Sequence, residues 1–193
     1  KQHVYRVVDM TPKESPPIAK GVLFSYNLLQ MITVHSHDCL FFGAIKGDEE
    51  KKMDRGMLNL AMDLGNEVTS CCLDDRERKL LVGEASGNIS VYNILSGVRL
   101  KRTAFNIPFG IRDMIYSPDK TVIALAGPGE LYIFDELPNE DSVSTRLRYT
   151  QAHDVDVVSM AYSYELGLIA TADCTDCLKI WDYEFLLLDT IIE

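Results

Sequence analysis

The chain has 193 residues, of which 47% are hydrophobic, and its 19 basic and 29 acidic residues give a formal net charge of -10. No stretch reaches the ~20 consecutive apolar residues that a membrane-spanning helix needs, and the first residues do not resemble a signal peptide. The acidic balance repels nucleic acid and anionic lipid. We therefore expect a soluble protein with no nucleic-acid or membrane partner, long enough to bury a core.

The first third of the chain, residues 1–66, is expected to hold one degenerate β unit. Residues 31–47 can be laid on the clearer unit that follows, and residues 40–43 then take the place of its second strand. The strand pattern stops at residues 48–66, which open on the charged run Asp48-Glu49-Glu50 and are rich in methionine. We interpret this segment as a loop insertion or a short helix.

Residues 67–193 contain three copies of a repeat, at about 67–102, 110–149 and 152–193. Each copy has the pattern strand, polar turn, strand, second turn, strand, with a candidate fourth strand behind it. The third strand always ends on an aromatic residue followed by Asn or Asp: Tyr92-Asn93, Phe134-Asp135 and Trp181-Asp182. These pairs are 42 and 47 residues apart. That spacing is close to the ~40 to 45 residues of a four-stranded propeller blade.

The repeat predicts an all-β fold, a β-propeller segment with three clear blades and a degenerate fourth. The strands are short, apolar and rich in β-branched residues, as expected when neighbouring blades cover both faces of a sheet. A row of four blades would leave strand edges unpaired. We therefore expect the chain to be part of a larger propeller, or to be completed by another propeller segment.

At Ile180-Trp181-Asp182 the chain resembles the WD-repeat family, which is named for that dipeptide. The resemblance implies a buried hydrogen-bonded set in the third repeat, structural in role. The acidic member fits loosely, because Thr175 stands at the family's usual offset and Asp176 is one residue late. The set implied by the resemblance is His153, Thr171, Asp176, Trp181 and Asp182.

The first two repeats lack the histidine of this set, and Ser86 and Pro128 stand where the turn aspartate belongs. We expect these two copies to be held by their apolar pattern alone. Within the family, residues 74–79 leading to 92–97, and residues 162–171, resemble ciliary and flagellar proteins that combine WD repeats with EF-hands. The resemblance implies a cytoplasmic location in the cilium or cytoskeleton. The chain has no EF-hand loop, so calcium binding does not carry over.

The cysteines offer little chemistry. Five is an odd number for a disulfide framework, so we expect a reducing compartment. Cys174 and Cys177 form a CxxC pair, but no second such pair exists to complete a zinc site. Cys71 and Cys72 are neighbours in one strand and should point to opposite faces. We expect reduced thiols with structural roles.

The sequence lacks the common catalytic motifs. The chain has no Gly-x-Ser-x-Gly sequence and no glycine-rich phosphate loop. Asp154 and Asp156 precede the third repeat on a loop, where solvated charges are common. An alternative hypothesis is a metal-dependent or enzymatic module built on His35, His37 and Cys39, which would need ligands from several blades. We expect no enzyme activity, cofactor or metal.

The sequence favours a non-catalytic protein interaction scaffold in a larger multiprotein assembly. The expected partners are proteins with basic or mixed-charge surfaces, another propeller segment or a cytoskeletal assembly. A ubiquitin-ligase receptor is disfavoured, because Trp181-Asp182 is followed by Tyr183-Glu184 and not by x-Arg. Insertions into a repeat usually map to its binding face. The expected contact residues are Asp48, Glu49, Glu50, Asp135, Glu136 and Asp141.

Overall fold

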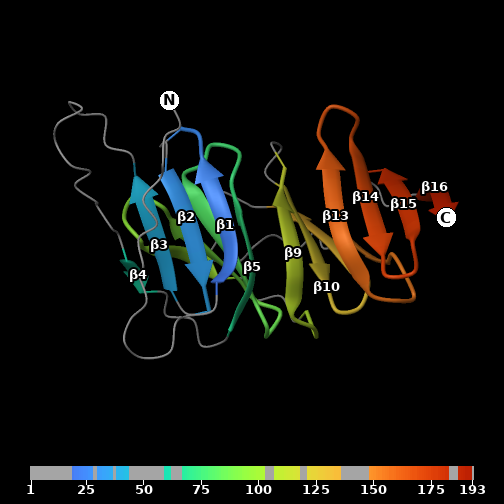
Figure 1. Cartoon of the computed structure of the whole chain (residues 1–193), viewed down its shortest axis with the longest axis horizontal. Coiled ribbons are helices and arrows are strands. Elements are labelled where there is room, and N and C mark those ends of the chain that lie inside the picture. The colour runs from blue at the N-terminus through green and yellow to red at the C-terminus, as the bar shows by residue number, and fades with distance from the viewer. Residues whose placement is uncertain are drawn as a thin grey trace, which may run out of the picture.

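Four antiparallel sheets, each of four strands, make up the part of the chain that the structure describes (Figure 1). It is a computed structural model that describes residues 19–27, 30–36, 38–43, 59–61, 67–102, 107–117, 121–135, 148–182 and 187–192. Every regular element in these ranges is a strand. Within them, no helix has the length and hydropathy that crossing a membrane requires.

The strands of each sheet follow one another along the chain, so each sheet is an antiparallel meander. Blade A contains β1 (Ala19–Ser25), β2 (Gln30–His35), β3 (Asp38–Gly43) and β4 (Asn59–Ala61). Blade B contains β5 (Val68–Leu73), β6 (Lys79–Glu84), β7 (Ile89–Asn93) and β8 (Arg99–Arg102). Blade C contains β9 (Ile111–Tyr116), β10 (Thr121–Ala126), β11 (Glu130–Asp135) and β12 (Arg148–Gln151). Blade D contains β13 (Val157–Ser163), β14 (Leu168–Asp173), β15 (Cys177–Asp182) and β16 (Leu187–Ile192).

The blades stack face to face, and their first strands lie side by side across the middle of the molecule (Figure 1). β1 contacts β5, β5 contacts β9, and β9 contacts β13. Successive sheets related in this way through their first strands are blades of a β-propeller. The predicted fold class, an all-β propeller segment, is confirmed.

Three apolar clusters fill the spaces between neighbouring blades. One joins blades A and B, one joins B and C, and one joins C and D. Blades B and D cover the two faces of β10, so all six of its residues are buried. This is why polar and apolar residues do not alternate in its sequence. Burial between blades therefore accounts for the apolar, β-branched strands.

The structure corrects the expected layout of the first blade. Residues 40–43 belong to its third strand, not its second, because β1 and β2 precede them as a pair. β4 lies inside residues 48–66, where a loop insertion or short helix was expected, and its pairing with β3 completes the blade. In blade C the fourth strand is β12, Arg148–Gln151, within the range of the expected repeat and the two residues after it.

Candidate functional site

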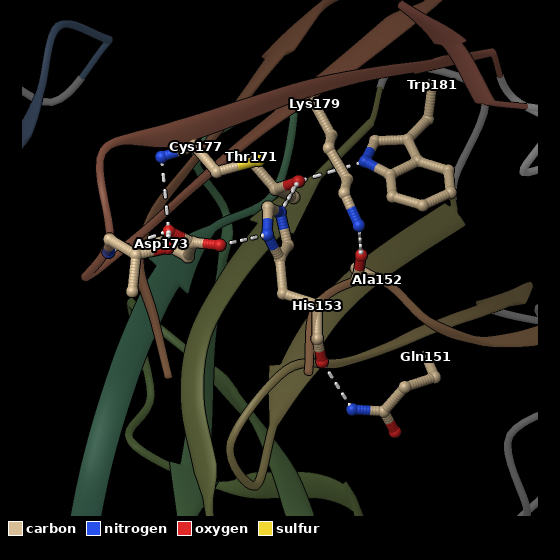
Figure 2. Close-up of polar contacts among 9 residues, drawn as sticks. Gln151, Ala152, His153, Thr171, Asp173, Cys177, Lys179 and Trp181 are labelled. Atoms are coloured by element: carbon tan, nitrogen blue, oxygen red, sulfur yellow. Dashed lines mark hydrogen bonds and ion pairs between the residues drawn. The ribbon is translucent and has the colours of Figure 1, made fainter. Parts of the chain in front are cut away.

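A buried hydrogen-bonded network links the loop before blade D to its second and third strands (Figure 2). His153 lies between two partners: its Nδ1 is 2.7 Å from Oδ2 of Asp173, and its Nε2 is 2.8 Å from Oγ1 of Thr171. The indole Nε1 of Trp181 donates to the same Thr171 oxygen at 2.9 Å. All four side chains are buried.

The direction of each hydrogen bond follows from the groups involved. An ionised carboxylate only accepts, so His153 donates from Nδ1 to Asp173. In the neutral imidazole Nε2 is then the acceptor, and the Thr171 hydroxyl donates to it while accepting from Trp181. Each polar atom of this chain of hydrogen bonds has a partner, which is the condition for burying such groups at low cost.

Asp173 also closes the turn between β14 and β15. Its Oδ1 accepts from the backbone N–H and the hydroxyl of Thr175 and from the backbone N–H of Cys177. Burial raises the pKa of Asp173, but the hydrogen bonds from Thr175, His153 and Cys177 outweigh it and hold the pKa well below its ordinary value. The carboxylate therefore stays ionised, as the network requires.

The acidic member of the network is Asp173, so the expectation of Asp176 was wrong. Asp176 is exposed at the tip of the turn. Its φ of 62° lies in the left-handed region, which aspartate tolerates, so Asp176 serves the backbone of the turn. Asp182 ends β15, where its backbone pairs with Leu168 of β14. The structure does bring His153, Thr171 and Trp181 together as the resemblance implied.

Further contacts fasten the loop that carries His153. Gln151 donates from Nε2 to the His153 carbonyl at 2.6 Å, and Lys179 donates from Nζ to the Ala152 carbonyl at 2.8 Å (Figure 2). The same ammonium group lies 5.9 Å from the centre of the Trp181 ring, within cation–π range. The loop is thus tied to β12 of blade C through Gln151 and to β15 of blade D through Lys179.

A metal ion fits this network poorly. His153, Asp173 and Cys177 have ligand atoms within 4.8 Å of one another. Both ring nitrogens of His153 are already hydrogen-bonded, and Oδ1 of Asp173 accepts three further hydrogen bonds. An ion could enter only by replacing these bonds, so the geometry is that of a structural network.

The alternative metal or enzymatic site is only partly within the described residues. His35 ends β2, and its Nε2 lies 3.1 Å from Oγ1 of Thr33. Cys39 lies in β3, where its backbone pairs with Val34, and His37 lies outside the described residues. The contact to Thr33 gives His35 a local structural partner.

Blade B holds a second buried network that the sequence reasoning missed. Glu84 is fully buried, and its carboxylate accepts from Ser90 Oγ at 3.0 Å, Ser86 Oγ at 3.1 Å and Arg102 Nη2 at 2.9 Å. Ser86, noted as a replacement for the turn aspartate, thus contributes a hydroxyl to this carboxylate. The expectation that the first two repeats are held by apolar pattern alone was wrong for blade B, because a buried carboxylate needs such partners.

The paired cysteines of β5 face opposite sides of the sheet, as expected. Cys71 packs against the cluster between blades A and B, and Cys72 lies in the cluster between blades B and C. Burial and the negative charge of Asp113 raise the pKa of Cys71 to about 11, and burial raises the pKa of Cys72 further. Both thiols are protonated at neutral pH and unsuited to nucleophilic chemistry. Cys71, Cys72, Cys174 and Cys177 are all free thiols.

Five short loops form one continuous row at a single end of blades B, C and D, which we call the loop rim. Backbone hydrogen bonds link neighbouring loops: Gly127 donates to Gly110, Ala152 to Gly129, and Cys174 to Asp156. Gly87 lies so close to the carbonyls of residues 107 and 109 that it has no room for a side chain. The rim comprises residues 85–88, 107–110, 127–129, 152–156 and 174–176.

The loop rim exposes apolar side chains beside carboxylates. Phe109, 42% exposed, packs on Gly127, and Val155 is 36% exposed. Asp154 and Asp156 flank Val155 and are exposed, and Asp156 makes an ion pair with Arg112 at 3.4 Å.

Of the expected contact residues, only Asp135 has a described backbone, at the end of β11. The others, Asp48, Glu49, Glu50, Glu136 and Asp141, lie outside the described residues.

No protein-family model and no curated protein sequence matches the chain. Solved structures do match it. A chain from a structure described as the mitotic checkpoint complex aligns with a TM-score of 0.69 at 18% identity, over 99% of this chain and 57% of that one. A computationally designed protein, Ika8, aligns with a TM-score of 0.68 at 14% identity, over 93% of this chain and 50% of that one. The chain therefore spans about half the length of these proteins, and at such low identity the likeness concerns the fold alone: the residues that the structure describes form a four-blade stretch of β-propeller.

Proposed function

We propose that the protein is a non-catalytic scaffold that binds a protein partner along the loop rim. The observation that carries this proposal is the rim itself, a row of five loops in which Gly87 packs on residues 107 and 109 and backbone hydrogen bonds join the remaining loops as far as blade D. A surface that is already ordered loses little conformational entropy when a partner docks. Rigid scaffolds that present loops commonly bind in this way.

The chemistry of the rim defines the kind of partner. Phe109 and Val155 offer two separated apolar contacts, and Asp154 and Asp156 place negative charge around the second. A basic segment with its own apolar side chains complements this pattern, and the net charge of -10 would attract it at long range.

The reactive side chains of the blades support a role without catalysis. His153 is 2% exposed and hydrogen-bonded at both ring nitrogens. A general base must reach the proton that it removes, and His153 has no free nitrogen with which to do so. The buried, high-pKa thiols of Cys71 and Cys72 are likewise unsuited to attack.

A finer proposal concerns the assembly. We propose that the chain works within a cytoplasmic multiprotein assembly of the cilium or cytoskeleton. The resemblance of residues 74–79, 92–97 and 162–171 to ciliary WD-repeat proteins supports the location. That one similar chain comes from a structure described as a complex favours a role in assembly.

Affinity capture followed by direct binding tests the scaffold. Tagged wild-type chain is compared with a rim variant, Phe109→Ser with Val155→Ser, and with a control variant, Leu95→Ser with Leu166→Ser. Leu95 and Leu166 are 69% and 71% exposed, in turns at the opposite end of their blades. Candidates that wild type captures are purified and titrated against all three chains.

The proposal expects at least ~10-fold weaker binding by the rim variant, unchanged binding by the control, and weaker binding as ionic strength rises. Equal binding by the wild-type chain and the rim variant would place the contact elsewhere on the propeller and overturn the proposal. Substrate turnover by the purified chain would overturn its non-catalytic part.

A further inference from the structure

The outer strand of blade B carries positive charge in an acidic chain. β8 has the sequence Arg99-Leu100-Lys101-Arg102, so three of its four residues are basic. No aspartate or glutamate occurs between Glu84 and Asp113, although the whole chain holds 29 acidic residues. The next outer strand, β12 of blade C, contains Arg148 and likewise no acidic residue. Positive charge is thus concentrated on the outer strands of two neighbouring blades.

The side chains of β8 are accessible on the circumference of the propeller. Blades A and C pack on the two faces of blade B, and β8 is the last strand of its sheet. Arg99 is exposed and Lys101 is half-buried. Two apolar residues that alternate with them, Val98 and Leu100, are 57% and 43% exposed. We call residues 98–102 the outer strip.

Arg102 fastens the outer strip to the body of blade B. Its Nη2 donates to Oε2 of the buried Glu84 at 2.9 Å. Its backbone pairs with Ser90, whose hydroxyl donates to the same carboxylate. Hydrogen bonds between charged groups are stronger than those between neutral ones, so this end of the strip is held firmly. A surface that is already ordered loses little conformational entropy when a partner docks.

Protection of the sheet edge is another role for these charges. Charged side chains and a β-bulge both discourage an edge strand from pairing with a further strand. β8 has both, because its register with β7 shifts between Val91 and Tyr92. Protection requires neither a single sign of charge nor two exposed apolar residues among the charges. The outer strip therefore has more than edge protection needs, and its side chains are the groups suited to binding.

We propose that the outer strip binds an acidic segment of a partner protein that carries apolar side chains of its own. Arg99 and Lys101 complement the carboxylates of such a segment, and Val98 and Leu100 contact its apolar side chains. A protein segment has fewer charges than a nucleic acid or an anionic lipid surface, so the net charge of -10 repels it least. This surface is separate from the loop rim, whose proposed partner is basic.

Selection from a random peptide library tests the outer strip while the partner is unknown. The immobilised wild-type chain is expected to enrich acidic peptides that contain apolar residues. These peptides are labelled and titrated in solution by fluorescence anisotropy, and their binding should weaken as ionic strength rises. A selection that yields no acidic peptide would overturn the proposal. The loop rim is judged by basic peptides in the same selection, so the two proposals fail separately.

A charge-reversal variant then locates the contact. Arg99→Glu with Lys101→Glu is expected to bind the acidic peptides at least ~10-fold more weakly than the wild-type chain. The matched control is Arg76→Glu with Arg78→Glu, at two exposed arginines between β5 and β6, because it changes the net charge equally. Acidic peptides that bind the charge-reversal variant as tightly as the control would overturn the proposal.

The apolar half of the contact needs its own variant. Val98→Ser with Leu100→Ser should also weaken binding of the acidic peptides, and unchanged binding would overturn the part assigned to these residues. Thermal unfolding shows that each variant is folded before its binding is interpreted. Where the charge-reversal variant unfolds, Arg99→Gln with Lys101→Gln replaces it.

Cosedimentation with vesicles of phosphatidylserine and phosphatidylcholine addresses the other anionic partner. The wild-type chain is expected to stay in solution. Sedimentation of the wild-type chain that charge reversal abolishes, without any acidic peptide bound, would assign the outer strip to a lipid surface and overturn the proposal.

Discussion

Replacing Thr171 with valine tests whether the blade D network stabilises the fold. Valine keeps the shape of threonine and removes the hydroxyl that joins His153 to Trp181. Two buried groups, the His153 Nε2 acceptor and the Trp181 N–H donor, then lose their partner. Each unpaired buried group costs about 1–3 kcal/mol, so we expect Thr171→Val to lower the free energy of unfolding by about 2–6 kcal/mol.

Urea unfolding followed by tryptophan fluorescence suits this measurement. Trp181 is the single tryptophan of the chain, so the signal comes from the network itself. Thr190→Val is the matched control, because Thr190 is exposed on β16, and its cost is expected within about 0.5 kcal/mol. A Thr171→Val chain as stable as the control would refute the argument that the hydroxyl is a needed partner.

A double-mutant cycle separates coupling from simple packing. Trp181→Phe removes the donor to Thr171, so the loss from Thr171→Val should be smaller in that background, because one orphaned group is already gone. Circular dichroism replaces fluorescence here, since the tryptophan is absent. Strictly additive losses would mean that the two residues stabilise the blade independently.

Three further predictions concern charge and backbone. Glu84→Gln keeps the shape of the side chain but removes the charge that faces Arg102. It should lower the free energy of unfolding, measured in urea, by about 1–3 kcal/mol. An unchanged midpoint of the urea unfolding curve would contradict the blade B network. Because the pKa of Asp173 is depressed in the folded state, its carboxylate stabilises the fold at pH values above the ordinary pKa of about 3.9, and this stability is lost as the pH falls. Between about pH 5 and 3 the melting temperature of the wild-type chain should therefore fall more than that of Asp173→Asn. Melting temperatures that fall in parallel would contradict a depressed pKa of Asp173. Gly87→Ala should lower the free energy of unfolding by about 1–3 kcal/mol, since φ is 82° and a Cβ would meet the Ile107 carbonyl; a neutral effect in thermal melts would contradict the close loop packing.

The strands of blades B, C and D could be predicted because burial imposes a simple pattern on them. β9 and β10 form the first two strands of the repeat expected at about residues 110–149, since short apolar runs separated by a polar turn leave few alternatives. Blade A could not be placed in the same way. Its first strand, β1, was not recognised, so residues 40–43 of β3 were expected in the second strand of the blade.

The acidic residues of the networks were missed because the family pattern directed attention to the turn. Glu84 and Asp173 occupy one register position, each paired with the first residue of its blade, Val68 or Val157. A signal existed in the sequence, since each acid is followed two residues later by a hydroxyl, Ser86 or Thr175, that donates to it. An acid-x-hydroxyl pattern at the end of a buried strand indicates such a partner better than the turn offset did.

That register position explains how blades of different chemistry present one continuous rim. Asp173 ties the loop of His153 to the following turn, and Glu84 ties the turn of blade B to Arg102 on its outer strand. Blade C has Ala126 there, and its turn is held instead by the backbone hydrogen bond from Gly127 to Gly110.

Buried side chains thus hold the turns of blades B and D at the two ends of the loop rim, whereas a backbone hydrogen bond holds the turn of blade C between them. A partner that lies along the rim meets Val155 on the most firmly anchored loop, because Asp173, Gln151 and Lys179 all restrain that loop. Pre-organised contacts hold a partner at the lowest entropic cost. The contribution of Val155 to binding should therefore depend on the buried network beneath it, so that Thr171→Val weakens partner binding even though Thr171 touches no solvent.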